Sequence, residues 1–237
     1  MRSHALVIAR RETGAYFSGP MVYIVTGLFL VFSGFLFFST FFLLNRAELR
    51  SFFSLLPVLF SFFIPALTMR LFAEETRSGS FETLVTLPVS AAEIVLGKFL
   101  AGWLSACTLL APTLVYAATA AFFGDLDPGP VVGGYLGAVL LASAFSAAGI
   151  FASSLTRNQI IAFFTAFAVC IVLTMIDQAA VFLPSGFADA AAFLSASAHF
   201  SSVSRGIIDS RDLVYFFSLT ALFFVLAVRT VERGRAK

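Results

Sequence analysis

Six long apolar stretches alternate with short polar segments along this chain. An α-helix rises 1.5 Å per residue, so about 20 apolar residues suffice to cross about 30 Å of hydrocarbon. Each stretch is close to that length or longer. The pattern therefore predicts an all-α integral membrane protein with six transmembrane helices. The expected spans are residues 21–44, 51–73, 98–123, 130–152, 159–176 and 213–228.

Composition supports a membrane protein and excludes several other classes. The chain has 237 residues, of which 59% are hydrophobic and only 12% are charged, whereas soluble domains carry about 25% charged residues. Six spans leave no room for a large soluble domain, so residues 1–237 are expected to form one membrane domain. A net charge of +2 gives no basic field for nucleic acid.

The distribution of Lys and Arg predicts the orientation. Six spans place both termini on one side, and the side richer in Lys and Arg is cytoplasmic. We therefore expect both termini in the cytoplasm. The terminus side would carry Arg2, Arg10, Arg11, Arg70, Arg77, Lys98, Arg157, Arg229, Arg233, Arg235 and Lys237, and the opposite side only Arg46, Arg50, Arg205 and Arg211.

The longest segment expected outside the membrane is residues 184–212. It is too polar for a seventh span, yet its apolar residues recur at helical spacing. We predict one or two amphipathic helices at the outer interface, with a solvated loop as the alternative. The recurring residues are Phe187, Ala191, Leu194 and Ala198.

No recognisable catalytic or metal-binding motif is present. The sequence has no HExxH, Gly-x-Ser-x-Gly or Cys-x-x-Cys pattern. His4 and His199 fall on opposite sides of the predicted membrane, where each is expected to be solvated or interfacial. Cys107 and Cys170 lie inside apolar runs and are expected to be small buried hydrophobes. The sequence therefore predicts a protein without catalytic residues or a metal site.

Ion-coupled carriers usually need an ionisable group near the middle of the membrane. None of the predicted spans has one at its centre, and Arg70 and Asp177 lie near span ends. A secondary carrier is therefore disfavoured, and the energy for any transport is expected to come from another subunit.

The segment between the second and third spans predicts a short helix at residues 80–87. Ser80 suits the N-cap, Glu82 lies in the first turn, and Pro88 ends the helix. Burial of its apolar face in a partner would contribute about 4–6 kcal/mol. The helix therefore suits a socket on a cytoplasmic partner, or alternatively the lipid surface. Its apolar face consists of Phe81, Leu84 and Val85.

A second helix start follows directly. Ser90 and Glu93 form a Ser-x-x-Glu capping box, and Val89 and Ile94 occupy the positions of a hydrophobic staple. A new helix is therefore expected to begin here and to continue into the third span.

These residues resemble a known family. The run containing Arg70, Glu74, Gly79, Glu82, Pro88, Ser90, Gly97 and Lys98 looks like the segment after the second span in permeases of the type 2 ATP-binding-cassette (ABC) exporter class. Residues 18–20, 65–70, 153–159 and 204–212 are similar to the gliding-motility-type ABC transporter permease. The resemblance extends over nearly the whole chain.

The resemblance implies six spans, an interface helix at residues 2–17, a cytoplasmic coupling helix and an outer helical hairpin before the last span. It implies a location in the bacterial cytoplasmic (inner) membrane. A second, smaller coupling loop would contain Thr156, Arg157 and Asn158, where Arg157 has the alternative role of an inside-positive anchor. The implied interface with the ATPase consists of Glu74, Glu75, Arg77, Gly79, Ser80, Phe81, Glu82, Leu84, Val85 and Pro88.

The chain lacks a phosphate-binding loop. Its one Gly-Lys pair, Gly97-Lys98, is followed by Phe99 rather than Ser or Thr. The expected complex therefore holds ATP and Mg²⁺ in a separate cytoplasmic ATPase, and this chain binds no cofactor. The expected partners are membrane lipid and a second membrane subunit in a homodimer or heterodimer, which the gliding-type resemblance implies to carry a large extracytoplasmic domain. The function would be export or extrusion, or alternatively force transmission by a non-transporting scaffold.

Hydroxyl and proline residues form a stripe along the second span. They recur at steps of three and four, so they share one helix face, and proline makes such a wall deformable. We expect this stripe to line a cargo pathway or the subunit interface, with ordinary helix packing as the alternative. The stripe is Ser54, Pro57, Ser61, Pro65 and Thr68. Gly133 and Gly137 of the fourth span form a GxxxG pattern that favours close helix packing.

Overall fold

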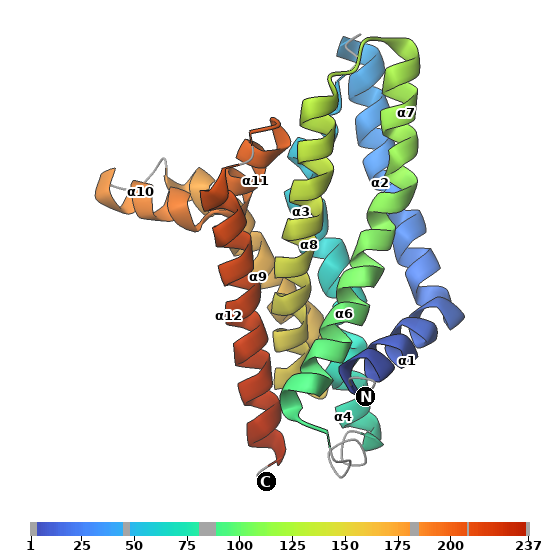
Figure 1. Cartoon of the computed structure of the whole chain (residues 1–237), viewed down its shortest axis with the longest axis vertical. Helices are drawn as coiled ribbons and strands as arrows, with labels where there is room; N and C mark the ends of the chain where they lie inside the picture. Colours follow the sequence, from blue (N-terminus) through green and yellow to red (C-terminus); the bar gives the residue numbers. More distant parts are fainter. Residues whose placement is uncertain (1–3, 45–47, 81–88, 181–184, 208, 236–237) are drawn as a thin grey trace.

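A computed structural model describes residues 4–44, 48–80, 89–180, 185–207 and 209–235. Every regular element in these ranges is a helix (Figure 1). The helices are α1 (His4–Ser18), α2 (Pro20–Leu44), α3 (Arg50–Thr68), α4 (Arg70–Ser78), α6 (Ala91–Leu110), the 3₁₀ turn η1 (Ala111–Thr113), α7 (Leu114–Phe123), α8 (Pro128–Leu155), α9 (Gln159–Ala180), α10 (Ser185–Leu194), α11 (Ala196–Ser204) and α12 (Ser210–Arg235).

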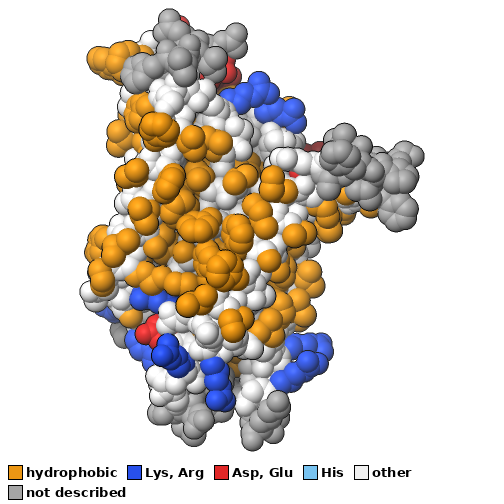
Figure 2. All heavy atoms as spheres, turned by 180° about the vertical axis from the view of Figure 1, so that it is seen from behind, with side chains coloured by type: hydrophobic (Ala, Val, Ile, Leu, Met, Phe, Trp, Pro, Cys, Tyr) orange, Lys and Arg blue, Asp and Glu red, His pale blue; other side chains and the backbone are white. Residues whose placement is uncertain are grey.

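The described chain contains six helical segments long and apolar enough to cross a membrane, which confirms the predicted number of spans. Two segments are composite, because α3 with α4 and α6 with η1 and α7 each act as one span. Figure 2 shows the resulting apolar belt with basic side chains near both of its ends. The spans are Pro20–Phe41, Arg50–Ser78, Ala91–Phe123, Pro128–Leu155, Gln159–Gln178 and Ser210–Gly234.

Helix α8 forms the centre of the bundle and packs against α3, α6, α9, α11 and α12. Its small residues allow these neighbours to approach closely. A Cβ at Gly134 would lie 2.3 Å from the Phe53 ring, and a Cβ at Gly133 would lie 2.4 Å from the Val203 carbonyl oxygen. Gly137 in turn faces Phe200 of α11. Packing alone therefore accounts for the small residues of this span, as the GxxxG pattern indicates.

The two ends of the bundle differ. The chain starts and finishes at the end that carries α4, called here the α4 end, where α1 crosses α6 (Figure 1). The opposite end carries α11 and is called the α11 end. The expected outer hairpin consists of two helices, α10 and α11, and this confirms the helical interpretation of the segment over the loop alternative.

His199 of α11, expected to be solvated or interfacial, is not freely solvated. Its side chain is only 12% exposed, and Nδ1 lies 2.6 Å from Oδ1 of Asp212. The ring stacks on Tyr215 with centroids 4.1 Å apart. The pair attaches the hairpin to the first turns of α12. His4 of α1, in contrast, is exposed.

Two further predictions concern the capping box before α6 and the two cysteines. The capping box is confirmed, since Ser90 Oγ accepts a hydrogen bond from the Glu93 amide at 3.2 Å and the Glu93 carboxylate accepts one from the Ser90 amide at 2.9 Å. Cys170 is fully buried as expected, whereas Cys107 is only partly buried, and both thiols are free.

Candidate functional site

Helix α1 is seated on α6 through a glycine. A Cβ at Gly97 would lie 2.7 Å from the Ile8 Cβ and 2.8 Å from the Ala5 carbonyl oxygen, which is closer than real contacts allow. Only a residue without a side chain fits between the two helices at this point. Gly97 therefore sets the depth at which α1 rests against the bundle.

The next residue, Lys98, is the most deeply buried charged residue among those that the structure describes. Its side chain is completely buried and belongs to a membrane-spanning helix. Nζ donates to the Leu71 carbonyl oxygen at 2.7 Å and to Oε1 of Glu12 at 3.3 Å. It also lies 2.8 Å from Oε2 of Glu75 and over the Phe72 ring, 5.1 Å from its centroid. A buried charge needs such partners, because burial without them costs several kcal/mol.

Arg11 extends this network to the surface. Its guanidinium lies 2.7 Å from Oε1 of Glu12 and 3.2 Å from Oε1 of Glu75. Partial burial raises the pKa of Glu12, but Lys98 and Arg11 outweigh that effect and hold the pKa below its ordinary value. The hydrogen bond to Glu12 raises the pKa of Arg11. Two cations and two carboxylates therefore form one ionic cluster that joins α1, α4 and α6.

Tyr16 makes a second attachment for α1. Its hydroxyl donates to the Leu67 carbonyl oxygen at 2.5 Å, and the Arg70 guanidinium lies over its ring, 4.4 Å from the centroid. Burial raises the pKa of the Tyr16 phenol, so it remains a neutral donor. The contact fixes the far end of α1 at the junction of α3 and α4.

That junction is held by a hydroxyl group of α8. Ser153 Oγ donates to the Met69 carbonyl oxygen at 2.7 Å and accepts from the Phe72 and Ala73 amides, both at 3.1 Å. A side chain that enters the helical hydrogen-bond ladder interrupts it locally. This interruption explains why the second span consists of α3 and α4, with Met69 between them.

The expected ATPase-coupling residues divide into three groups. Glu75 belongs to the ionic cluster, while Glu74 and Arg77 of α4 and the following Gly79 and Ser80 are exposed. Gly79 has φ of 76°, a left-handed conformation that favours glycine as a helix C-cap. The remaining predicted residues lie outside the described residues. They are Phe81, Glu82, Leu84, Val85 and Pro88.

The second predicted coupling loop is the turn between α8 and α9. The Thr156 hydroxyl accepts from the Asn158 amide at 3.1 Å, and Asn158 Oδ1 accepts from the Ile160 amide at 2.9 Å. Thr156 and Asn158 therefore shape the turn and cap α9, whereas the Arg157 side chain is exposed at the α4 end. Ser153 lies three residues before Thr156, so this loop is directly connected to the junction of α3 and α4.

The hydroxyl and proline stripe of α3, expected to line a cargo pathway or the subunit interface or else to pack internally, is largely buried within the chain. Ser61 is fully buried and lies 2.9 Å from the Thr174 hydroxyl of α9, and Thr68 fills the space beside Gly149 of α8. Pro57 and Pro65 are also buried, and only Ser54 is exposed. The structure therefore places this stripe in helix packing within one chain, where its hydroxyls also bond to carbonyl oxygens of α3.

From the sequence, Lys98 is expected at the cytoplasmic rim, and Arg11 and Glu12 have no expected role in a site. The sequence separations of the cluster are 86 residues for Lys98 and Glu12 and 64 for Arg11 and Glu75. Patterns among neighbouring residues cannot predict contacts between residues so far apart in the sequence. The one signal in the sequence is the position of Lys98, the eighth residue of a helix whose start is marked by the capping box of Ser90 and Glu93. Among the described residues, no group of three or more His, Cys, Asp or Glu is arranged to hold a metal ion.

The geometry defines a six-span helical membrane protein with its charged cluster at the α4 end. Residues 45–229 match the family model described as ABC-2 family transporter protein, and the chain belongs to that family. It is therefore a membrane component of an ABC transporter and a multi-pass permease. A comparison with curated proteins gives no significant match.

Proposed function

We propose that this chain is the permease subunit of an ATP-driven exporter, coupled to a separate cytoplasmic ATPase and working as a homodimer or heterodimer in the bacterial inner membrane. The α4 end would face the cytoplasm. The family membership and the basic residues of that end support this orientation. The described basic residues there include Arg10, Arg11, Arg77, Arg157 and Arg233.

The observation that carries the proposal is the set of contacts on α4. This helix leads directly into residues 80–87, the predicted coupling helix, and it is fixed on three sides. Glu75 joins it to Lys98 of α6, Ser153 joins it to α8, and Arg70 joins it to Tyr16 of α1. A displacement of the coupling segment would therefore move three helices together rather than α4 alone.

The test is assembly with an ATPase subunit encoded by a neighbouring reading frame that contains a phosphate-binding loop. Phe81→Asp with Leu84→Asp should abolish co-purification of that ATPase, while membrane insertion is retained. Phe122→Asp is the matched control, since Phe122 is 85% exposed on α7 at the opposite end. Unchanged assembly of the double variant with the ATPase would contradict the coupling assignment.

A non-transporting scaffold that transmits force to extracytoplasmic partners is the second candidate. The hairpin supports it, because α10 extends sideways from the bundle and Phe193 is 69% exposed (Figure 1). This geometry and the resemblance to gliding-motility-type permeases suit a partner membrane protein with a large extracytoplasmic domain. Phe193→Asp should weaken capture of such a partner but leave ATPase assembly intact under either candidate function. Cargo movement in proteoliposomes that contain permease and ATPase alone would favour the exporter.

A further inference from the structure

A cavity of about 320 Å³ opens at the α11 end, where α3, α8 and the turn after α11 meet. Two membrane-spanning segments begin beside it, at Arg50 and Pro128. The cavity therefore lies at the boundary between hydrocarbon and lipid headgroups.

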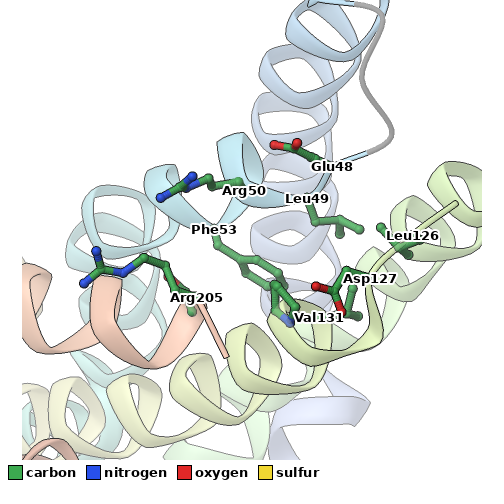
Figure 3. A pocket seen from close by; sticks show the side chains of 10 residues that line it. Glu48, Leu49, Arg50, Phe53, Leu126, Asp127, Val131 and Arg205 are labelled. Carbon is green, nitrogen blue, oxygen red and sulfur yellow. The ribbon is translucent and has the colours of Figure 1, made fainter. Parts of the chain in front are cut away.

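The cavity has a charged rim and an apolar floor (Figure 3). Phe53 and Leu49 form part of the floor and are 1% and 3% exposed. Phe53 is held there by Gly134 on one side and by edge-on contact with the Tyr135 ring at 5.4 Å. The floor is thus a fixed part of the core, and the cavity is preformed.

Two arginines reach the rim from different elements. Arg50 begins α3, and Arg205 follows α11, and their guanidinium groups lie on the same side of the cavity (Figure 3). Arg205 Nε donates to the Ser201 carbonyl oxygen at 3.1 Å, which leaves its terminal nitrogens available. Within the part of the chain that the structure describes, neither arginine forms an ion pair.

The backbone beside Arg205 is positioned by close glycine contacts. Gly206 has φ of 84°, and a Cβ there would lie 3.1 Å from the Gly129 carbonyl carbon. Gly133 leaves even less space beside Val203, where a Cβ would lie 2.4 Å from the carbonyl oxygen. These contacts press the end of α11 onto the first turn of α8, so Arg205 is held next to α8 rather than carried on a free loop.

Two carboxylates complete the rim. Asp127 Oδ1 caps α8 by accepting from the Gly129 amide at 3.0 Å, and Glu48 is exposed just before α3. In Figure 3 the Asp127 carboxylate lies across the Phe53 ring from the two guanidinium groups. The rim therefore carries both signs of charge, which disfavours a polyanion and suits a ligand with an anionic and a cationic group.

We propose that this cavity binds the phosphoethanolamine headgroup of a phospholipid in the leaflet at the α11 end. Arg50 and Arg205 bind the phosphate, since guanidinium groups form strong charge-assisted hydrogen bonds to phosphate oxygens. Glu48 and Asp127 lie near the ammonium group. The apolar floor receives the glycerol and the first methylene groups. This site is independent of the proposed function in export.

The test uses the full chain in detergent with dihexanoyl phosphatidylethanolamine as the probe and native mass spectrometry as the readout. Arg50→Gln with Arg205→Gln should weaken binding by about 10- to 100-fold, the value of one or two charged hydrogen bonds. Arg211→Gln is the matched control, because Arg211 is an exposed arginine of the same end that does not line the cavity. An equal loss in Arg211→Gln, or no loss in the double variant, would overturn the proposal.

Further arms distinguish the chemistry and the source of the ligand. Glu48→Gln should reduce the preference for phosphatidylethanolamine over phosphatidylglycerol, and equal binding of both lipids by the unmodified chain would overturn recognition of the ammonium group. Free phosphoethanolamine should compete weakly because it lacks the apolar part. Competition equal to that of the lipid would overturn the role of the floor. All variants alter exposed side chains, and equal thermal midpoints would verify that they fold.

Discussion

The ammonium nitrogen of Lys98 lies 2.8 Å from Oε2 of Glu75, at a position that solvent does not reach. The contact is one of charge rather than an aligned hydrogen bond, because Oε2 of Glu75 has no hydrogen-bond partner, while Lys98 donates to the Leu71 carbonyl oxygen and to Glu12. It connects the start of the third span to the last turns of the second. Such a pair specifies one relative position of the two helices, since any displacement would separate buried charges.

Removal of one partner should therefore be costly. Lys98→Met retains the aliphatic volume but leaves Glu75 and Glu12 with only Arg11 as a counter-charge. We expect a loss of at most about 3–5 kcal/mol in folding free energy, the range for removing one partner of a buried ion pair, because Arg11 still compensates part of the charge. Unfolding of the purified protein in detergent measures it. Lys98→Met with Glu75→Gln should lose less than the sum of the two single variants, and strict additivity would contradict a direct interaction.

Glu12 predicts an acid-sensitive attachment of α1. Burial raises the pKa of Glu12, but Lys98 and Arg11 together lower it by more, so the pKa in the folded state lies below the ordinary 4.5. The folded state then binds fewer protons than the unfolded state, and the stabilisation is complete above about pH 4.5 and is lost as the pH falls through the folded pKa. The protection of the α1 amides against hydrogen exchange, expressed relative to the intrinsic exchange rate at each pH, should therefore decrease on acidification.

Glu12→Gln supplies the comparison for this pH effect. The variant should show faster exchange of α1 than the unmodified chain at pH 7, and the difference between the two at the same pH should diminish as the pH falls below about 4.5. Glu74→Gln, an exposed carboxylate on α4, should leave the pH profile unchanged. A constant difference between Glu12→Gln and the unmodified chain at every pH would show that charge is not the cause.

Sequence patterns predicted the features that depend on neighbouring residues. Span positions follow from apolar length, and the start of α6 follows from the Ser90 and Glu93 capping box. Lys98 and the stripe of α3 were misplaced because their environments depend on distant helices. Ser61 meets Thr174 across 113 residues of sequence, so periodicity identified its helix face correctly but not which helix covers that face.

Ser153 should control the junction between α3 and α4. Ser153→Ala would leave the Phe72 and Ala73 amides and the Met69 carbonyl oxygen without their shared partner. We expect a loss of about 1–3 kcal/mol, the cost of buried polar groups without hydrogen bonds, and faster amide exchange at residues 69–73. Ser154→Ala is the control, because its hydroxyl bonds only within α8, to the Phe151 carbonyl oxygen at 2.7 Å. Equal effects of both substitutions would contradict a specific role for Ser153.

Gly97 offers the sharpest test of whether α1 must rest against the bundle for coupling. A methyl group at Gly97 would meet the Ile8 Cβ at 2.7 Å and the Ala5 carbonyl oxygen at 2.8 Å. The first contact is a branched side chain and the second is backbone, so neither can move away cheaply. Gly97→Ala should therefore displace α1 and pull Glu12 from Lys98. We expect α1 to become accessible to protease and stimulation of the partner ATPase to fall.

The matched substitution is Gly14→Ala within α1 itself. A Cβ at Gly14 meets nothing within 4 Å, and alanine in a helix interior is more favourable than glycine by about 1 kcal/mol. That variant should keep α1 protected and ATPase stimulation intact. If Gly97→Ala also left both unchanged, α1 would not need its close seat on α6, and the ionic cluster would serve stability alone. Loss of protection without loss of stimulation would separate the attachment of α1 from force transmission through α4.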